Sequence, residues 1–246
     1  MLNLVLNIMK KVLFIVSCLL FTLAACEVDN YEAPNASVHG SILDEKTGEL
    51  VGTDIQDGGS IGVKELGFEN GYYQYWAIKN TGEYRNDMVF AATYDVKFEN
   101  TNFYPFEEKD WVVRKGDNTR DFQVTPYLRV VNPTITKNGN IVTATFSLEG
   151  GKGTEKVKSM QLFAFTDMWV GNIVKFAVTG GTDKLSFETP EAIVAGETYT
   201  LTIDVSKNAS LFKYERNYYF RIGVLADVSG VGTVKHNYSP LVVIKF

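Results

Sequence analysis

Cysteine is scarce in this 246-residue sequence, and both cysteines, Cys18 and Cys26, lie near its N-terminus. The 220 residues after Cys26 therefore offer no disulfide, no thiolate metal site and no cysteine nucleophile, and their stability has to come from packing. Histidine is equally rare, with only His39 and His236. Neither lies in a zinc-protease, nucleophile-elbow or triad pattern, so we predict strand positions and no catalytic role for them.

Basic residues are also in deficit, with 24 Lys and Arg against 29 Asp and Glu, for a net charge of −5. We therefore expect no nucleic-acid partner. Carboxylates are plentiful, but Asp44-Glu45 and Glu107-Glu108 fall on predicted loops, where we interpret them as solvated. They match neither the acid–base pair of a glycoside hydrolase nor a calcium loop. We predict no catalytic residue, no metal and no cofactor, which makes the chain a non-enzyme; an unrecognised hydrolase is the alternative.

One hydrophobic run stands out, Val12 to Leu23, which follows Lys10 and Lys11. It is too short to span a membrane and is typical of a secretion signal. The signal ends in Leu23-Ala24-Ala25-Cys26, which resembles the lipobox of bacterial lipoproteins. We predict a cleaved signal peptide at 1–25 and a lipid on Cys26, where each buried methylene would contribute about 0.8 kcal/mol to anchoring. The alternative is an ordinary cleavable signal whose cysteine is accidental.

Residues 26–35 are predicted to form a lipidated tether. Its acidic residues Glu27, Asp29 and Glu32 resemble the export signal of surface-exposed Bacteroidetes lipoproteins. This resemblance implies an outer-membrane lipoprotein that faces the medium. A plain polar tether is the other interpretation.

The next segment, 36–128, reads as a small antiparallel sandwich. Alternation is clearest from Phe90 to Phe98, and Gly48 provides a turn between two short apolar segments. The residues that resemble carboxypeptidase-regulatory, transthyretin-like domains are Val38 to Asp44, Thr47 to Glu49, Gly82 to Tyr84 and Ala92 to Val96. That family implies a seven-stranded sandwich, usually non-catalytic; residues 100–110 depart from it and are predicted to form a loop.

Residues 129–133, which end on Pro133, are predicted to be a short linker, because proline denies a backbone donor to a central sheet. The linker is partly apolar, so we expect the flanking domains to pack against each other. In 134–246, Asn138-Gly139 predicts a hairpin and the alternation restarts. Strands are predicted near 142–148, 160–165, 173–178, 184–187, 199–205, 218–224 and 241–246. About seven strands at this spacing resemble an immunoglobulin or fibronectin type III domain. The predicted fold class is all-β, with two tandem β-sandwich domains after a cleaved lipoprotein signal peptide.

A broader resemblance rests on residues 29–36, 124–130, 218–224 and 236–240. These stretches are similar to a Bacteroidetes two-domain lipoprotein family of unknown function, encoded beside starch-utilisation-type outer-membrane glycan transporters. The resemblance implies glycan capture at the cell surface, next to a transporter pair. It supplies no catalytic residues.

Aromatic residues are the one enrichment suited to ligand binding, because sugar C–H faces stack on Trp and Tyr rings. Tyr73 and Tyr75 would share one face of a strand, with Trp76 on the other. Trp111 follows a polar loop. Trp169 lies between Asp167 and Asn172, and we prefer it as the platform. The alternative for any one tryptophan is a place in the core. The candidate glycan-binding residues are Trp169, Asp167, Asn172, Trp76, Tyr75, Tyr73 and Trp111.

These observations favour a non-catalytic surface lipoprotein of a polysaccharide-utilisation system that binds a polysaccharide or oligosaccharide. The alternative is a structural or assembly subunit of the transporter complex with no sugar affinity of its own.

Overall fold

The computed structural model describes residues 9–11 and 32–246, and the chain divides into two compact units, Met1–Ala33 and Pro34–Phe246. Apart from residues 9–11, the predicted signal peptide lies outside the described residues, as does Cys26. None of the helical residues that are described forms a segment long and apolar enough to cross a membrane.

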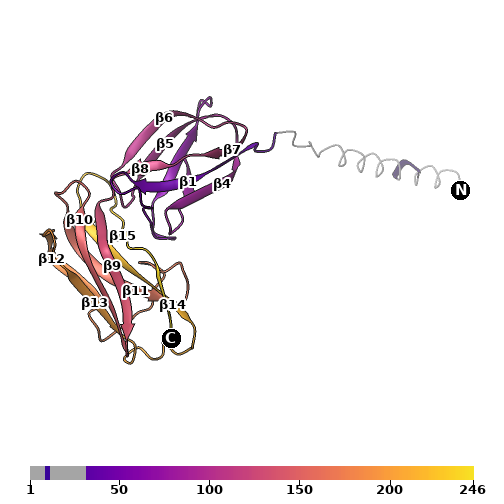
Figure 1. Ribbon diagram of the computed structural model, residues 1–246. Coiled ribbons are helices and arrows are strands. Elements are labelled where there is room, and N and C mark those ends of the chain that lie inside the picture. The colour runs from indigo at the N-terminus through magenta and orange to yellow at the C-terminus, as the bar shows by residue number, and fades with distance from the viewer. Residues whose placement is uncertain (1–8, 12–31) are drawn as a thin grey trace. The chain divides into compact units, whose positions relative to one another are not determined.

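Two sheets form the first sandwich (Figure 1). In one sheet, β1 is flanked by β4 on one side and, in parallel, by β7 and then β8 on the other. The other sheet has the antiparallel order β3-β2-β5-β6. The strands are β1 (Ala36–Asp44), β2 (Ser60–Glu65), β3 (Gln74–Ala77), β4 (Glu83–Val89), β5 (Thr93–Glu99), β6 (Phe106–Val112), β7 (Gly116–Thr119) and β8 (Phe122–Val124).

Alternation decides which side chains fill this first core. Tyr94, Val96 and Phe98 of β5 are buried, as the sequence predicts. The predicted loop at 100–110 is wrong in its second half, where β6 pairs with β5. Asp110 has φ 56° and lies in a bulge opposite Asp95, and this extra residue turns Phe106 and Trp111 to the same face. Because Phe106 and Trp111 are five residues apart, a search for strict alternation of apolar and polar residues does not detect this strand.

The second sandwich also has two sheets, of order β13-β10-β9 and β12-β11-β14-β15, with β16 paired to the other end of β14 (Figure 1). Its strands are β9 (Leu128–Asn138), β10 (Ile141–Gly150), β11 (Lys156–Phe165), β12 (Lys184–Ala192), β13 (Tyr199–Asp204), β14 (Asn217–Asp227), β15 (Asn237–Tyr238) and β16 (Val242–Lys245). The predicted all-β class with tandem sandwiches is confirmed. The finer transthyretin-like and fibronectin-like resemblances stay predictions.

The predicted hairpin at Asn138-Gly139 joins β9 to β10, and Gly139 has φ 56°. Val142, Ala144, Phe146 and Leu148 of β10 are buried, as their alternation predicts. The predicted strand at 173–178 is wrong, because these residues form no strand. Phe176 nevertheless packs against the core through its ring.

The predicted linker at 129–133 is also wrong, because these residues belong to β9. Asn132 and Pro133 together face one residue of β10, in a bulge where Asn132 has φ 47°. β9 is the edge of its sheet, so the proline needs no partner for a missing N–H group. The two sandwiches therefore follow each other with almost no connecting segment.

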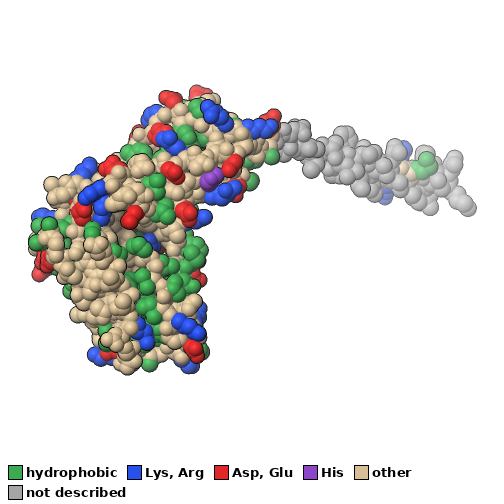
Figure 2. All heavy atoms as spheres, viewed as in Figure 1, with side chains coloured by type: hydrophobic (Ala, Val, Ile, Leu, Met, Phe, Trp, Pro, Cys, Tyr) green, Lys and Arg blue, Asp and Glu red, His purple; other side chains and the backbone are tan. Residues whose placement is uncertain are grey.

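Charges of both signs are interspersed over the face drawn in Figure 2, and hydrophobic side chains form an elongated stripe along the second sandwich.

Candidate functional site

Arg129 of β9 crosses from the second sandwich to Asp44 at the end of β1. Its Nε and Nη2 donate to the two carboxylate oxygens at 2.5 and 2.8 Å, and both side chains are buried. Burial alone would raise the pKa of Asp44, but hydrogen bonds from Arg129 and from the Lys46 N–H outweigh it and lower the pKa. The interpretation of Asp44 as a solvated turn residue was wrong.

A second arginine, Arg221 of β14, is buried at the same joint. It donates to the carbonyl oxygens of Ser239, Thr53 and Asn80 at 3.0, 2.9 and 2.8 Å. Thr53 and Asn80 belong to the first sandwich and Ser239 to the second. Burial lowers the pKa of Arg221 to about 10, which still leaves it charged at neutral pH.

The ring of Tyr238 lies 4.2 Å from this guanidinium and links two loops. Its hydroxyl donates to Asp54 Oδ2 at 3.1 Å and accepts from the Asn172 N–H at 3.1 Å. Asp54 also accepts from the Ile173 N–H at 3.4 Å. The two domains therefore pack against each other, as expected.

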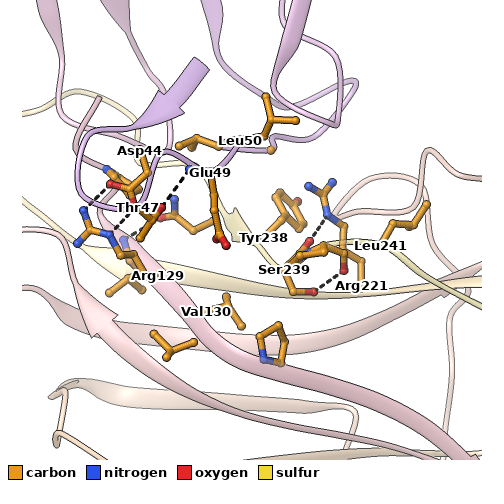
Figure 3. Close-up of a pocket in the computed structure, with 18 of the residues that line it drawn as sticks. Asp44, Thr47, Glu49, Leu50, Arg129, Val130, Arg221, Tyr238, Ser239 and Leu241 are labelled. Carbon is orange, nitrogen blue, oxygen red and sulfur yellow. Dashed lines mark hydrogen bonds and ion pairs between the residues drawn. The ribbon is translucent and has the colours of Figure 1, made fainter. Parts of the chain in front are cut away.

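A groove of about 770 Å³ opens beside these contacts (Figure 3). Its volume lies within the usual range of ligand sites, which favour domain junctions. Apolar side chains from both sandwiches line it together with a few polar groups. They include Leu50, Val130, Val131, Pro133, Met168 and Leu241, with Thr47, Glu49, Thr81 and Asn132 among the polar residues.

This lining can hold a sugar. Leu50 and Met168 are 47% and 40% exposed and offer apolar surface to C–H groups. Figure 3 shows the Glu49 side chain projecting between Arg129 and Tyr238, where its carboxylate could accept hydrogen bonds from hydroxyl groups. The same apolar surface would also suit a protein partner.

The three predicted loop residues, Asp167, Trp169 and Asn172, belong to the loop that supplies Met168 to the groove. Trp169 is 36% exposed and directly follows Met168, which belongs to the groove wall. Asp167 is exposed, and its Oδ1 accepts from the Trp169 N–H at 3.3 Å. The Asn172 side chain is partly buried and accepts from Lys175 Nζ at 3.1 Å. Trp169, Asp167 and Asn172 do not themselves line the groove, so their role as a sugar platform stays a prediction.

Trp76 and Trp111 do not form a surface platform. Trp76 is 8% exposed, and its ring meets that of Trp111 edge-on at 6.2 Å. Trp111 is partly buried against Phe122. Both fill the first core, which is the alternative stated for any single tryptophan.

Tyr73 and Tyr75 share the outer face of the β3 sheet, as predicted, and neither lines the groove. Tyr75 is 59% exposed, whereas Tyr73 is partly buried under Lys97 and Lys64.

The predicted non-catalytic groups have structural partners. His39 lies in β1 beside Asp117, and His236 lies between the rings of Phe163 and Tyr238. Glu108 belongs to β6, where Arg120 pairs with it at 2.6 Å, so it is not a loop residue. Within residues 9–11 and 32–246, no group of three or more His, Cys, Asp or Glu side chains could hold a metal ion.

Sequence reasoning missed Arg129 and Arg221. Each interrupts an apolar strand, Leu128-Arg129-Val130 and Phe220-Arg221-Ile222, where a charge is costly to bury without partners. That interruption was the available signal, although it could not name the partners.

Comparison with known families gives two matches. Residues 36–125 match the N-terminal domain of DUF3823, described as a protein of unknown function, and residues 128–243 match the domain of unknown function DUF3823_C. The chain belongs to the DUF3823 family. The broader resemblance noted in the sequence is thereby confirmed at the level of a Bacteroidetes family of unknown function.

Solved relatives cover nearly the whole described unit. A Bacteroides uniformis protein described as a "putative carbohydrate binding protein" is 63% identical, with a TM-score of 0.84, and the match covers 87% of this chain and 100% of that one. DUF3823 proteins from Bacteroides ovatus and Parabacteroides merdae share the fold at 21% and 17% identity. Their TM-scores are 0.65 and 0.68, and the matches cover 86% and 87% of this chain and 99% and 100% of theirs. A search of curated proteins found no match.

Proposed function

We propose that this DUF3823 protein is a non-catalytic glycan-binding lipoprotein of the outer membrane, which holds a polysaccharide or oligosaccharide at the cell surface. The observation that carries the proposal is the groove at the domain joint, with the Trp169 loop beside it. Its mixture of apolar walls and hydroxyl-binding groups is typical of sugar sites. The 63% identical relative described as a carbohydrate binding protein supports the same ligand class.

The test is affinity electrophoresis of the lipid-free chain from Glu27 in gels that contain starch, xyloglucan, arabinogalactan, mannan or homogalacturonan. We expect at least one polymer to retard the protein. Trp169→Ala and Glu49→Gln should each weaken binding, by about tenfold for the tryptophan.

Tyr214→Ala is the matched control, because Tyr214 is 64% exposed and does not line the groove. It should bind as the unmodified chain does. If no polymer retards the unmodified chain, glycan binding is wrong. Release of reducing ends during the incubation would contradict the non-catalytic part and favour a hydrolase.

The N-terminal sequence supports attachment to the outer membrane and exposure at the cell surface. A thioether-linked lipid on Cys26 would anchor the protein, and the acidic tether would accompany export to the surface. Mass spectrometry of the membrane fraction should find diacylated Cys26 as the mature N-terminus, and protease added to intact cells should remove the protein. An unmodified Cys26 would contradict the anchor, and complete protection would place the protein on the periplasmic side.

A second candidate is an assembly subunit that contacts the neighbouring glycan transporter pair. The exposed Leu50 and Met168 at the groove favour it, because clustered apolar side chains also mark protein interfaces. Co-purification with the transporter that Leu50→Asp abolishes, together with no retardation of the unmodified chain by any polymer, would favour this candidate over the first.

A further inference from the structure

The outer face of the β3-β2-β5-β6 sheet carries an exposed tyrosine directly over a glycine. Tyr75 of β3 pairs with Gly62 of β2, and Gly62 pairs on its other side with Lys97 of β5. The three residues form one row across the sheet. Tyr75 is at the edge of this row and is 59% exposed.

The missing side chain of Gly62 makes room for this ring. A β-carbon on Gly62 would lie 3.2 Å from Tyr75 Cε1 and 3.0 Å from Lys97 Cγ. Both side chains therefore lean over the glycine from opposite sides. Glycine within a strand is otherwise unfavourable, and it often marks a place where another group approaches the backbone closely.

The neighbouring Tyr73 has a different environment. Lys97 Nζ lies 4.4 Å and Lys64 Nζ 5.5 Å from the centre of its ring. A ring face covered by two ammonium groups is not open to a sugar. Tyr75 is therefore the open ring of the pair.

The charges on this face neutralise one another. Lys97 pairs with Glu99 at 2.8 Å, Lys64 with Asp95 at 3.5 Å, and Lys109 with both Asp95 and Glu107 at 3.3 Å. An anionic ligand would have to break these pairs before it gained an ammonium group. The charge pattern therefore complements an uncharged ligand.

We propose that the Tyr75 ring over Gly62 is a second glycan-contact site, separate from the groove, which takes a neutral glycan and not a uronate or sulfated one. The site extends the proposed function, because it binds the same class of ligand. A chain with two contact sites would hold a long polymer more tightly than a short oligosaccharide.

The test uses the same lipid-free chain and the same neutral polymers, with homogalacturonan as the anionic comparison. Tyr75→Ala should weaken binding of the retained neutral polymer by roughly tenfold. Tyr75→Phe should keep most of the affinity, because the ring and not the hydroxyl provides the contact. Tyr214→Ala again serves as the exposed-tyrosine control.

Gly62→Ala tests whether binding can be weakened without a loss of folding. Its new methyl group would lie 3.0 Å from Lys97 Cγ, 3.2 Å from the Tyr75 ring and 3.3 Å from the Lys97 carbonyl oxygen. Shifts of a few tenths of an ångström relieve these contacts, so the fold should survive with nearly the same melting temperature, while the displaced ring weakens binding. Binding by Tyr75→Ala and Gly62→Ala equal to that of the unmodified chain would overturn the second site, as would retention by homogalacturonan alone.

The outcomes also separate the two sites. Weaker glycan binding by Tyr75→Ala with unchanged binding by Trp169→Ala would support the sheet site and contradict the groove. Weaker binding by Trp169→Ala with unchanged binding by Tyr75→Ala would support the groove and contradict the sheet site. If none of the polymers retards the unmodified chain, both sites are wrong.

Discussion

The fold opposes protonation of His236. It is partly buried between Phe163 and Tyr238, and its backbone carbonyl accepts from the Asn102 side chain at 3.1 Å. Burial, and then the ammonium group of Lys175, lower its pKa from 6.5 to about 4. The folded protein therefore holds His236 neutral at pH values where the unfolded chain binds a proton.

We predict that the free energy of unfolding falls as the pH drops from about 6.5 toward 4, because only the unfolded state takes up this proton. No stability is lost above about pH 6.5. The loss in the free energy of unfolding reaches on the order of 1 kcal/mol by pH 5, after allowance for partial exposure. Urea unfolding at pH 7 and pH 5 measures it. His236→Gln should flatten this interval; an equal pH dependence in the variant would contradict the assignment.

Below pH 4, buried carboxylates determine how the free energy of unfolding depends on pH. Burial raises the pKa of Asp54, but its backbone and Tyr238 hydrogen bonds outweigh that effect and lower it. The pKa of Asp44 is likewise lowered, because its hydrogen bonds outweigh the effect of burial. Their stabilisation is present above the unfolded-state pKa near 3.9 and is lost as the pH falls through the lower folded value.

At the scale of elements, β1 depends on a close backbone approach. β1 pairs with β7 and β8 on one edge, and the chain between them brings the Arg120 carbonyl over Gly40. A β-carbon on Gly40 would lie 1.8 Å from that oxygen, which also accepts from the Tyr84 hydroxyl. The parallel pairing thus requires glycine at this position.

We predict that Gly40→Ala lowers the free energy of unfolding by about 3 kcal/mol, because backbone has to move to relieve the overlap. Gly48→Ala is the control, since Gly48 has φ 73° but no neighbour within 4 Å of the added carbon. It should cost only about 1 kcal/mol. Chemical denaturation measures both, and similar losses in the two variants would contradict the close-approach argument.

Bulges explain which strands the sequence hid. Asp110 and Asn132 each add a residue to a strand and interrupt its period of two. The loop at 100–110 was predicted from its departure from the family pattern and the linker at 129–133 from its proline, and neither argument anticipates a bulged strand. Strands such as β5, β10 and β14 were predicted correctly, because the extra residue of each bulge lies in the neighbouring strand and leaves their own alternation unbroken.

For the whole molecule, the buried arginines make the two sandwiches one unit. Arg221 satisfies carbonyl groups of both sandwiches, and Arg129 pairs with Asp44 across the joint. Buried charges are not strong net stabilisers, yet removing one partner leaves the others unsatisfied. Each sandwich therefore depends on the other for hydrogen bonds.

We predict that the lipid-free chain unfolds in a single calorimetric transition and that Arg221→Met splits it in two, with a loss of about 3 kcal/mol. Arg216→Met is the control, since Arg216 donates one exposed hydrogen bond, to the Thr166 carbonyl. It should leave one transition at nearly the original temperature. A single unshifted transition in Arg221→Met would mean that the joint does not couple the domains.

The sequence by itself determined the all-β class, the two domains, the hairpin turns and the buried rows of the regular strands, because these follow from local alternation and turn chemistry. It also placed Trp169 on a loop and Tyr73 and Tyr75 on a common face. Only the tertiary structure decided that Trp76 and Trp111 are core residues, that Asp44 is buried, and that a groove forms beside Arg129 and Arg221. Those outcomes depend on contacts between residues far apart in the chain, and alternation along a strand carries no information about which distant segment will cover it.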